Sequence, residues 1–244
     1  MKKVFISDLH LNDDQPLITS MFKSYLESLI KNNKDDIELY IIGDLFESWV
    51  GDDHETPLHQ YIKSALLELT TSNIKTYFLY GNRDFLIGNK FLEETGVELI
   101  SDPYVFTYKN KKVLVSHGDK FCIDDTEYQM FRKIVRNKDW QKDFLGFPIS
   151  KRLKIAGEAK DASQNSKEKK SMTIMDVNQA TIEKVINAHQ VDLIIHGHTH
   201  RPAKHIIESN NHYCERFVLG DWTDESVIIL DWSNEDPVLI DLIN

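Results

Sequence analysis

Five short runs of valine, isoleucine, leucine and aromatic residues recur along the chain. They cover residues 3–7, 38–42, 75–80, 113–116 and 192–195. Because polar residues hardly interrupt these runs, their hydrophobic pattern is continuous rather than alternating, which is typical of strands buried on both faces of a sheet. The pattern therefore predicts five buried strands.

A helical pattern separates the first strands from one another. Apolar residues recur every three or four positions in residues 16–33, and again in residues 58–72. We expect Asp14 to cap the first of these helices, with Pro16 in its first turn, where the missing N–H has no helical partner to lose. Strands that alternate with helices predict a layered α/β fold.

The alternation stops at about residue 124. Helical patterns at 127–137, 140–155 and 172–189 surround a small, polar and lysine-rich segment at 156–171. We interpret residues 124–190 as a helical lid inserted into a single domain that spans residues 1–244. Three short β-like runs follow, and they predict a closing antiparallel segment. They cover residues 216–219, 226–231 and 237–240.

Composition narrows the possible functions. The 29 basic and 39 acidic residues leave a net charge of −10, which argues against a groove that binds nucleic-acid phosphates nonspecifically. The chain is 41% hydrophobic and 28% charged, as expected for a folded protein. Cys122 and Cys214 lie far apart, so we expect neither a disulfide scaffold nor a thiolate zinc site, and we expect a reducing cytosol.

The sequence predicts neither secretion nor a membrane span. Only three apolar residues follow Lys2 and Lys3 before Asp8, which is too few for the core of a signal peptide. No stretch approaches the roughly 18 apolar residues that a spanning helix requires. We therefore expect a cytoplasmic protein.

Each of the five predicted buried strands is followed by side chains that bind metals. These residues are Asp8, His10, Asp44, Asn82, His117, His198 and His200. One Gly-Asp pair after a strand is usually only a turn, but turn chemistry gives no reason for Asp, His and Asn at five strand ends. Sites in open α/β sheets assemble at the carboxyl edge. The pattern predicts a metal centre shared by these seven residues.

The ligand types restrict the metal and the substrate. Seven oxygen and nitrogen ligands are too many for one ion, so we expect two ions from the Mg, Mn, Fe and Zn group. Two divalent ions exceed the charge of two aspartates by about +2, which favours an anionic substrate group such as phosphate. Arg83 offers a planar donor suited to phosphate oxygens. The alternative for Arg83 is a salt bridge to a neighbouring aspartate.

Five motifs carry a resemblance to a known family. They are Asp-Leu-His at 8–10, Gly-Asp at 43–44, Gly-Asn-Arg-Asp at 81–84, His-Gly-Asp at 117–119 and Gly-His-Thr-His at 197–200. As a set they resemble the signature of the calcineurin-like metallophosphoesterases. That resemblance implies an α/β fold in which a layered β-sandwich is flanked by helices and carries a helical cap insertion. Residues 44–53, 81–86 and 174–179 further resemble the UDP-2,3-diacylglucosamine diphosphatases of that family, enzymes of lipid A biosynthesis.

The resemblance implies a ligand set and a reaction. Two Mn²⁺ ions are expected, with one carboxylate, that of Asp44, shared between them. Asp8, His10, Asp44 and His200 would hold one ion, and Asp44, Asn82, His117 and His198 the other. Activated water would attack the phosphorus attached to uridine, releasing UMP and 2,3-diacylglucosamine 1-phosphate (lipid X). Asn82 and Arg83 would be the catalytic residues that contact the phosphates as charge builds.

The same resemblance implies substrate contacts in the lid. The full expected set is Asn82, Arg83, Asp125, Ser163, Lys167, Lys170 and His198, with Ser166 as an alternative to Ser163. The lysines could instead belong to a solvated charged loop. We expect Asp84 and Asp119 to orient histidine or arginine side chains, and His196 to have a structural or supporting role.

Residues 140–155 have two interpretations. Their apolar members could line a groove for two acyl chains, with Lys142, Lys151, Arg152 and Lys154 touching anionic head groups, or they could be the packed side of a helix. The lipid-linked UDP-sugar substrate implies a protein bound peripherally to the cytoplasmic face of the inner membrane. We expect no nucleic-acid partner and no obligate protein partner.

Three other functions remain open. Another dinuclear metallophosphoesterase, acting on nucleotide sugars, cyclic nucleotides or phosphoproteins, would share the same metal motifs. A binding scaffold that has lost its chemistry should have lost ligands, yet every expected position holds a competent residue. A nuclease is disfavoured by the net charge of −10.

Overall fold

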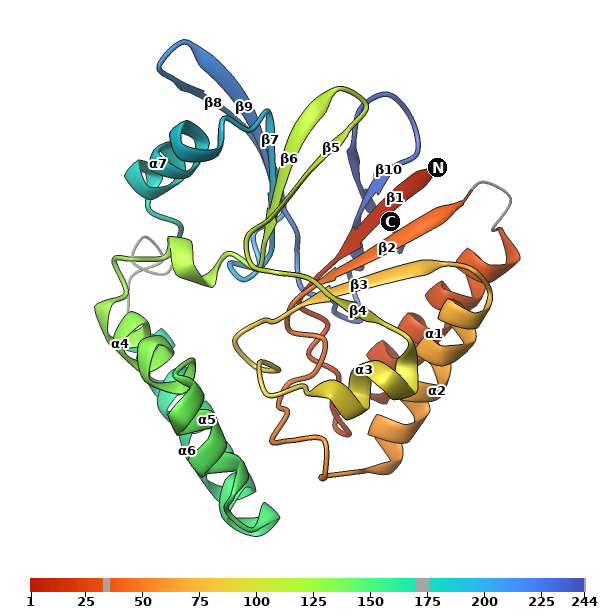
Figure 1. Cartoon of the computed structure of the whole chain (residues 1–244), viewed down its shortest axis with the longest axis vertical. Helices are drawn as coiled ribbons and strands as arrows, with labels where there is room; N and C mark the ends of the chain where they lie inside the picture. The colour runs from red at the N-terminus through yellow and green to blue at the C-terminus, as the bar shows by residue number, and fades with distance from the viewer. Residues whose placement is uncertain (33–35, 170–175, 244) are drawn as a thin grey trace.

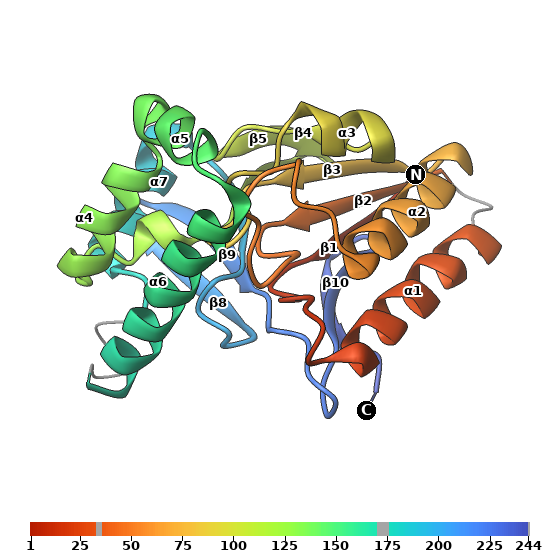
Figure 2. The same ribbon diagram turned by 90° about the horizontal axis from the view of Figure 1, so that it is seen from below.

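The computed structural model describes residues 1–32, 36–169 and 176–243, without the side chains of residues 163–169. The chain forms two mixed β-sheets that pack face to face, with helices on both outer faces (Figures 1 and 2). This arrangement confirms the predicted α/β sandwich flanked by helices. None of the helices in the described parts of the chain has the length and apolar character needed to span a membrane.

The first sheet has six strands in the order β11-β10-β1-β2-β3-β4. Strands β1 (Lys2–Ile6), β2 (Ile37–Ile42), β3 (Lys75–Leu79) and β4 (Glu98–Leu99) run parallel, and β10 (Ile228–Trp232) and β11 (Val238–Asp241) close one edge antiparallel. The connecting helices are α1 (Pro16–Lys31), α2 (Pro57–Thr71) and α3 (Asn89–Thr95). They cover the outer face of this sheet (Figure 1).

The second sheet has five strands in the order β5-β6-β7-β9-β8. Strands β6 (Lys111–Ser116), β7 (Leu193–His196) and β9 (His212–Val218) run parallel to one another. Strands β5 (Tyr104–Tyr108) and β8 (Ala203–Ser209) flank them antiparallel. Helix α7 (Gln179–His189) packs on the outer face, where Ile182 and Ile186 meet Leu114 and Ile194.

Successive side chains of a buried strand point to opposite faces of the sheet and so pack into two different hydrophobic cores. In β1, Val4 and Ile6 belong to the core under α1 and α2, whereas Phe5 belongs to the core between the sheets. In β7, Leu193 and Ile195 face the core between the sheets and Ile194 faces α7. Both faces of each strand are thus buried, which explains the continuous apolar runs of the sequence.

Three helices, which we call the cap, lie beside the strand ends rather than on a sheet. They are α4 (Thr126–Val135), α5 (Lys138–Leu145) and α6 (Ile149–Lys169), preceded by the short helix η1 (Asp119–Phe121). Figures 1 and 2 show the cap extending from the two-sheet body. Helix α7 also falls within the predicted 124–190 insertion, but it packs on the second sheet.

The structure differs from several helix predictions. The position before α1 is Gln15, and no side chain caps the helix, so the expected cap by Asp14 is wrong. The predicted segment 140–155 is two helices, separated by Gly146–Pro148, where proline disfavours a helical conformation in the preceding residue. Helix α6 continues to Lys169 through the predicted polar segment, because alanine, glutamate and lysine favour helix even without an apolar stripe. Helix α7 starts after its cap residue Asn178, and residues 172–175 lie outside the described residues.

Candidate metal centre

The carboxyl ends of five strands meet at one end of the sandwich. Strands β1, β2 and β3 of the first sheet deliver Asp8, His10, Asp44 and Asn82, and strands β6 and β7 of the second sheet deliver His117, His198 and His200. The site therefore lies across both sheets. All seven predicted ligands come together there, each within 4 Å of at least one other.

Most of these residues have an unusual backbone conformation. Asp8, His10, Asp44, His198 and His200 have φ values of 56°, 50°, 54°, 69° and 53°. A residue other than glycine in this left-handed region costs on the order of 1–3 kcal/mol, and such residues persist only where the surrounding structure holds them. Five of seven predicted ligands share this conformation, so the backbone is shaped around the arrangement of their side chains.

Two glycines allow the aspartates to lie close to neighbouring loops. A Cβ atom at Gly81 would lie 2.0 Å from Asp44 Oδ1, and one at Gly197 would lie 2.2 Å from Asp8 Oδ2. Real Cβ atoms do not approach other atoms so closely. Glycine is thus required beside each carboxylate, which explains the glycine in two of the motifs.

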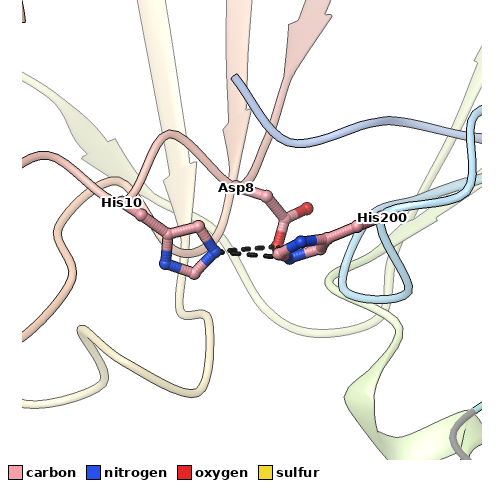
Figure 3. Close-up of side chains that lie close together, drawn as sticks. All are labelled: Asp8, His10 and His200. Atoms are coloured by element: carbon pink, nitrogen blue, oxygen red, sulfur yellow. Dashed lines mark hydrogen bonds and ion pairs between the residues drawn. The ribbon is translucent and has the colours of Figure 1, made fainter. Parts of the chain in front are cut away.

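Asp8, His10 and His200 form one group of candidate ligands (Figure 3). His10 Nε2 lies 3.3 Å from His200 Nε2, and Asp8 Oδ1 lies 3.3 Å from His200 Nε2 and 3.8 Å from His10 Nε2. Asp8 is fully buried, and its Oδ1 atom has no hydrogen-bond partner. A buried carboxylate oxygen is normally satisfied, so this atom, facing two imidazole nitrogens, fits a ligand of a cation.

A second group joins Asp8 to Asp44 and His117. Asp44 Oδ2 lies 3.6 Å from His117 Nε2 and 3.9 Å from His10 Nε2, so Asp44 lies within 4 Å of one histidine from each group. Asn82 Oδ1 lies 3.0 Å from His117 Nε2 and 2.8 Å from His198 Nδ1. The donor set, two carboxylates, one amide oxygen and four imidazoles, suits divalent ions of the Mn, Fe and Zn type.

Three histidines are oriented through their second ring nitrogen. His10 Nδ1 lies 3.0 Å from Glu47 Oε2, His200 Nδ1 lies 3.3 Å from Asp221 Oδ2, and His117 Nδ1 lies 3.0 Å from the Ile42 carbonyl oxygen. Metal-binding histidines commonly have an oxygen acceptor beside one ring nitrogen, which leaves the other nitrogen for the metal. Neither Glu47 nor Asp221 is among the ligands and supporting residues predicted from the sequence. Glu47 lies in a segment that carried the family resemblance, but nothing local marked its contact with His10.

The field around two of the predicted histidine ligands favours positive charge. Burial acts to lower the pKa of His117, but the carboxylates of Asp44 and Asp8 overcome it and raise that pKa to about 9. Burial likewise opposes protonation of His200, yet the nearby carboxylates of Asp221 and Asp8 raise its pKa to about 10. The carboxylates thus stabilise cations even against desolvation, as a metal centre requires.

The two aspartates expected to orient other side chains behave differently. Asp119 accepts hydrogen bonds from Tyr128 Oη and Arg132 Nε of α4, both at 2.7 Å, so it does hold an arginine. Asp84 instead accepts from the backbone N–H groups of Gly81 and Leu45, at 2.8 and 2.7 Å. For Asp84 the prediction was therefore wrong, because the carboxylate shapes two ligand-bearing loops.

His196 and Arg83 lie beside the centre in different ways. His196 is fully buried, and its Nε2 lies 2.9 Å from Arg216 Nη1, a supporting position as expected. Arg83 donates its backbone N–H to Asp44 Oδ1 at 2.8 Å. Its buried Nε has no partner, and within the described parts of the chain no salt bridge joins its guanidinium to an aspartate. The guanidinium thus retains a donor for a ligand.

The predicted cap residues are only partly described. Asp125 accepts a hydrogen bond from Tyr128 N at 3.1 Å and caps α4. Ser163 and Lys167 fall within α6, and their side chains, like all of Lys170, lie outside the described residues. Phe144 is buried in the core under α1 and α2, and Trp140, Phe147 and Ile155 pack against that core. These contacts favour the interpretation that most apolar residues of 140–155 form the packed side of a helix. Leu145 and Leu153 remain exposed.

Comparisons with known proteins agree with this geometry. Residues 1–202 match the family model of the calcineurin-like phosphoesterases. A protein named UDP-2,3-diacylglucosamine hydrolase from Serratia proteamaculans is 44% identical over 94% of each chain. Proteins of the same name from Haemophilus influenzae and Vibrio parahaemolyticus are 43% and 42% identical, over 93% and 94% of this chain and 92% and 93% of their own.

Among solved structures, Vps29 from Entamoeba histolytica complexed with zinc is 11% identical and covers 99% of each chain with a TM-score of 0.41. That likeness is too low to support any statement about the site. The family model and the relatives carry the assignment. The chain belongs to the calcineurin-like phosphoesterase family, and within it to the group of proteins that bear the name UDP-2,3-diacylglucosamine hydrolase.

Proposed function

We propose that this chain hydrolyses the diphosphate of UDP-2,3-diacylglucosamine with the help of two Mn²⁺ ions. Water attacks the phosphorus attached to uridine, and the products are UMP and 2,3-diacylglucosamine 1-phosphate. The reaction belongs to lipid A biosynthesis. The protein draws its diacyl substrate from the cytoplasmic face of the inner membrane, to which it binds peripherally.

One observation carries this proposal over other phosphoesterase activities. The metal motifs are common to the whole family, so only the cap can distinguish substrates. The predicted insertion makes up 67 of the 244 residues, yet the match to the Serratia protein covers 94% of this chain. The similarity therefore includes most of the cap as well as the metal centre.

The chain's own residues have distinct roles in the proposed reaction. Asp8, His10, Asp44 and His200 hold one ion and Asp44, Asn82, His117 and His198 the other, consistent with the distances between them. When bound, two divalent ions polarise the phosphate and lower the pKa of water to near neutrality. Arg83 directs its guanidinium at the phosphate oxygens, where negative charge builds as the bond to the leaving group breaks.

The alternative is a dinuclear phosphoesterase that acts on another phosphate ester. A mass-spectrometric assay separates the two. The chain should release UMP and a diacylglucosamine phosphate from UDP-2,3-diacylglucosamine. Rapid turnover of a soluble phosphodiester without release of UMP from the lipid substrate would contradict the proposal.

The metal assignment has its own test. Asp44→Ala removes a carboxylate that lies within 4 Å of one histidine from each group, so the variant should lose at least one equivalent of bound Mn²⁺ and nearly all activity. Asp224→Ala, which alters an exposed aspartate in a loop, is the matched control and should keep both. Equal metal content in the two variants would exclude the proposed role of Asp44.

The membrane proposal rests on exposed apolar side chains of the cap. Met130, Phe131 and Ile134 of α4 are 69%, 44% and 55% exposed. The chain should sediment with vesicles of phosphatidylglycerol and phosphatidylethanolamine, and replacing all three by serine should weaken this binding. Ile206→Ser removes an exposed residue of β8 and serves as the control. Failure of the unaltered chain to sediment with vesicles would refute peripheral binding.

A further inference from the structure

Glu47 contacts both the metal centre and the cap. Its Oε2 lies 3.0 Å from His10 Nδ1, and its Oε1 lies 3.1 Å from Lys160 Nζ on α6. The Glu47 side chain is 16% exposed. One largely buried carboxylate thus uses its two oxygens for two different parts of the molecule.

We propose that Glu47 is a positioning residue that couples the position of the cap to the affinity of the metal centre. It orients His10 toward a metal ion, and Lys160 holds Glu47 in the orientation that does so. This inference rests on the metal centre of the proposed function, and it adds a link between that centre and the cap.

Backbone hydrogen bonds fix the position of Glu47 relative to His10. The segment after β2 runs beside the loop that carries His10: Leu11 N donates to the Leu45 carbonyl oxygen at 2.9 Å, and Glu47 N donates to the Leu11 carbonyl oxygen at 3.2 Å. Glu47 is therefore anchored to the residue that follows His10. With its backbone fixed, the carboxylate needs only a side-chain rotation to face the imidazole or to leave it.

The contact with Glu47 determines which nitrogen of His10 faces the ligand cluster. The negative charge of the carboxylate 3.0 Å from Nδ1 stabilises a proton on that nitrogen and leaves Nε2 unprotonated, and Nε2 is the atom that lies 3.8 Å from Asp8 Oδ1 and 3.9 Å from Asp44 Oδ2. Carboxylates in this position typically change metal affinity by about 10- to 100-fold when they are removed.

Lys160 supplies the restraint from the cap. Its side chain is 41% exposed, so as an ion pair it contributes little to stability. Lys160 pairs with Oε1, the Glu47 oxygen that does not face His10. It therefore favours the carboxylate orientation in which Glu47 contacts both His10 and Lys160. His200 has a similar partner in Asp221, at 3.3 Å, but the ion pairs of the described residues join Asp221 only to His200. The link to the cap is a property of Glu47.

Coupling of this kind is reciprocal. If the docked cap raises the affinity for a metal, then the metal must stabilise the docked cap by the same factor. Mn²⁺ binding should therefore slow amide exchange in the described turns of α6, although α6 supplies none of the predicted metal ligands.

The experiment measures Mn²⁺ binding to the metal-stripped full chain by electron paramagnetic resonance and calorimetry, with hydrogen exchange of α6 in parallel. Glu47→Gln should weaken Mn²⁺ binding about 10-fold or more. Lys160→Met should weaken it by a smaller factor, about two- to fivefold, the range of a partly exposed ion pair. The double variant should bind no more weakly than Glu47→Gln alone, because Lys160 acts through Glu47.

Lys154→Met is the matched control, since Lys154 lies on the same helix with a side chain that is 77% exposed. It should leave both measurements unchanged. Unaltered Mn²⁺ affinity in Lys160→Met, or α6 exchange that does not respond to Mn²⁺, would overturn the coupling. These results would leave the proposed function standing as long as the unaltered chain binds Mn²⁺ and releases UMP, whereas a chain that binds no Mn²⁺ would overturn both.

Discussion

Arg152→Met should release the cap from the body of the protein. Arg152 lies on α6 and is 2% exposed. Its Nη1 donates to the Val50 carbonyl oxygen at 2.6 Å and to Asp53 Oδ1 at 2.7 Å, and its Nε donates to the Phe147 carbonyl oxygen at 2.9 Å. Its Nη2 pairs with Asp53 Oδ2. One side chain thus ties the cap to the segment that follows β2.

The loss of docking free energy can be estimated from the hydrogen bonds that each partner of Arg152 loses. The Asp53 side chain is 60% exposed, so its carboxylate regains water and the ion pair itself contributes little. Of the two carbonyl oxygens that lose their donor, that of Phe147 belongs to the cap itself, so only that of Val50 affects docking, and a buried acceptor without a partner costs about 1–3 kcal/mol. Methionine preserves most of the apolar contact. We expect the cap to lose about 1–3 kcal/mol of docking free energy, roughly a 5- to 140-fold shift toward the undocked state.

Hydrogen exchange measures this shift directly, because it reports local opening separately from global unfolding. Amides in the described turns of α6 should exchange faster in Arg152→Met, while those of β1 and β2 should not change. Gly51→Ala gives an independent test: its Cβ would lie 2.4 Å from Arg152 Nη1, and φ at this position is 126°, so it should displace the arginine.

Lys154→Met should leave exchange in α6 unchanged. Full protection of α6 in Arg152→Met would contradict this role of the arginine, since it would mean that apolar packing alone docks the cap. Asp53→Asn should have a smaller effect than Arg152→Met, because the two carbonyl contacts of the arginine remain.

Three further predictions concern the body of the protein. Leu66→Ala, at a fully buried position of α2, should destabilise the chain by about 2–5 kcal/mol in urea unfolding, and a value below about 1 kcal/mol would contradict its place in the core. Burial raises the pKa of Cys122 and of Cys214 to about 12, so both stay protonated at pH 8 and should react with a thiol reagent only after unfolding; rapid labelling of the native chain would refute their burial. Mn²⁺ at 100 times its dissociation constant should stabilise the chain by about 2.7 kcal/mol, and a thermal melt that does not respond to a chelator would contradict a metal centre.

The sequence predicted the fold where local pattern and tertiary environment agree. The five buried strands were identified within one or two residues, because burial on both faces produces a continuous apolar run. The missed strands are β4, β5 and β8. Strand β4 has two residues, and β8 carries exposed side chains such as Ile206, which is 72% exposed. Such strands lack the apolar run that marked the others.

The cap was harder to predict for a related reason. The solvent-facing turns of α6 follow from intrinsic helix propensity rather than from an apolar face, so periodicity gave no signal for residues 156–169. In one of the two interpretations of residues 140–155, Arg152 contacts lipid head groups. It is instead buried against Asp53, 99 positions earlier in the chain. No local pattern in the sequence reveals a contact at that separation.

The candidate metal centre shows why some functional residues leave a local signal and others do not. Each predicted ligand has a positive φ or adjoins a glycine at which neighbouring atoms leave no room for a Cβ atom, and these requirements restrict neighbouring residues. They produce short motifs that are visible in one sequence. Glu47 and Asp221 need only to reach a histidine from a distant loop, and many backbones allow this without any special neighbour. Residues that position a ligand therefore emerge only from the three-dimensional structure, although their contacts determine which nitrogen the ligand presents.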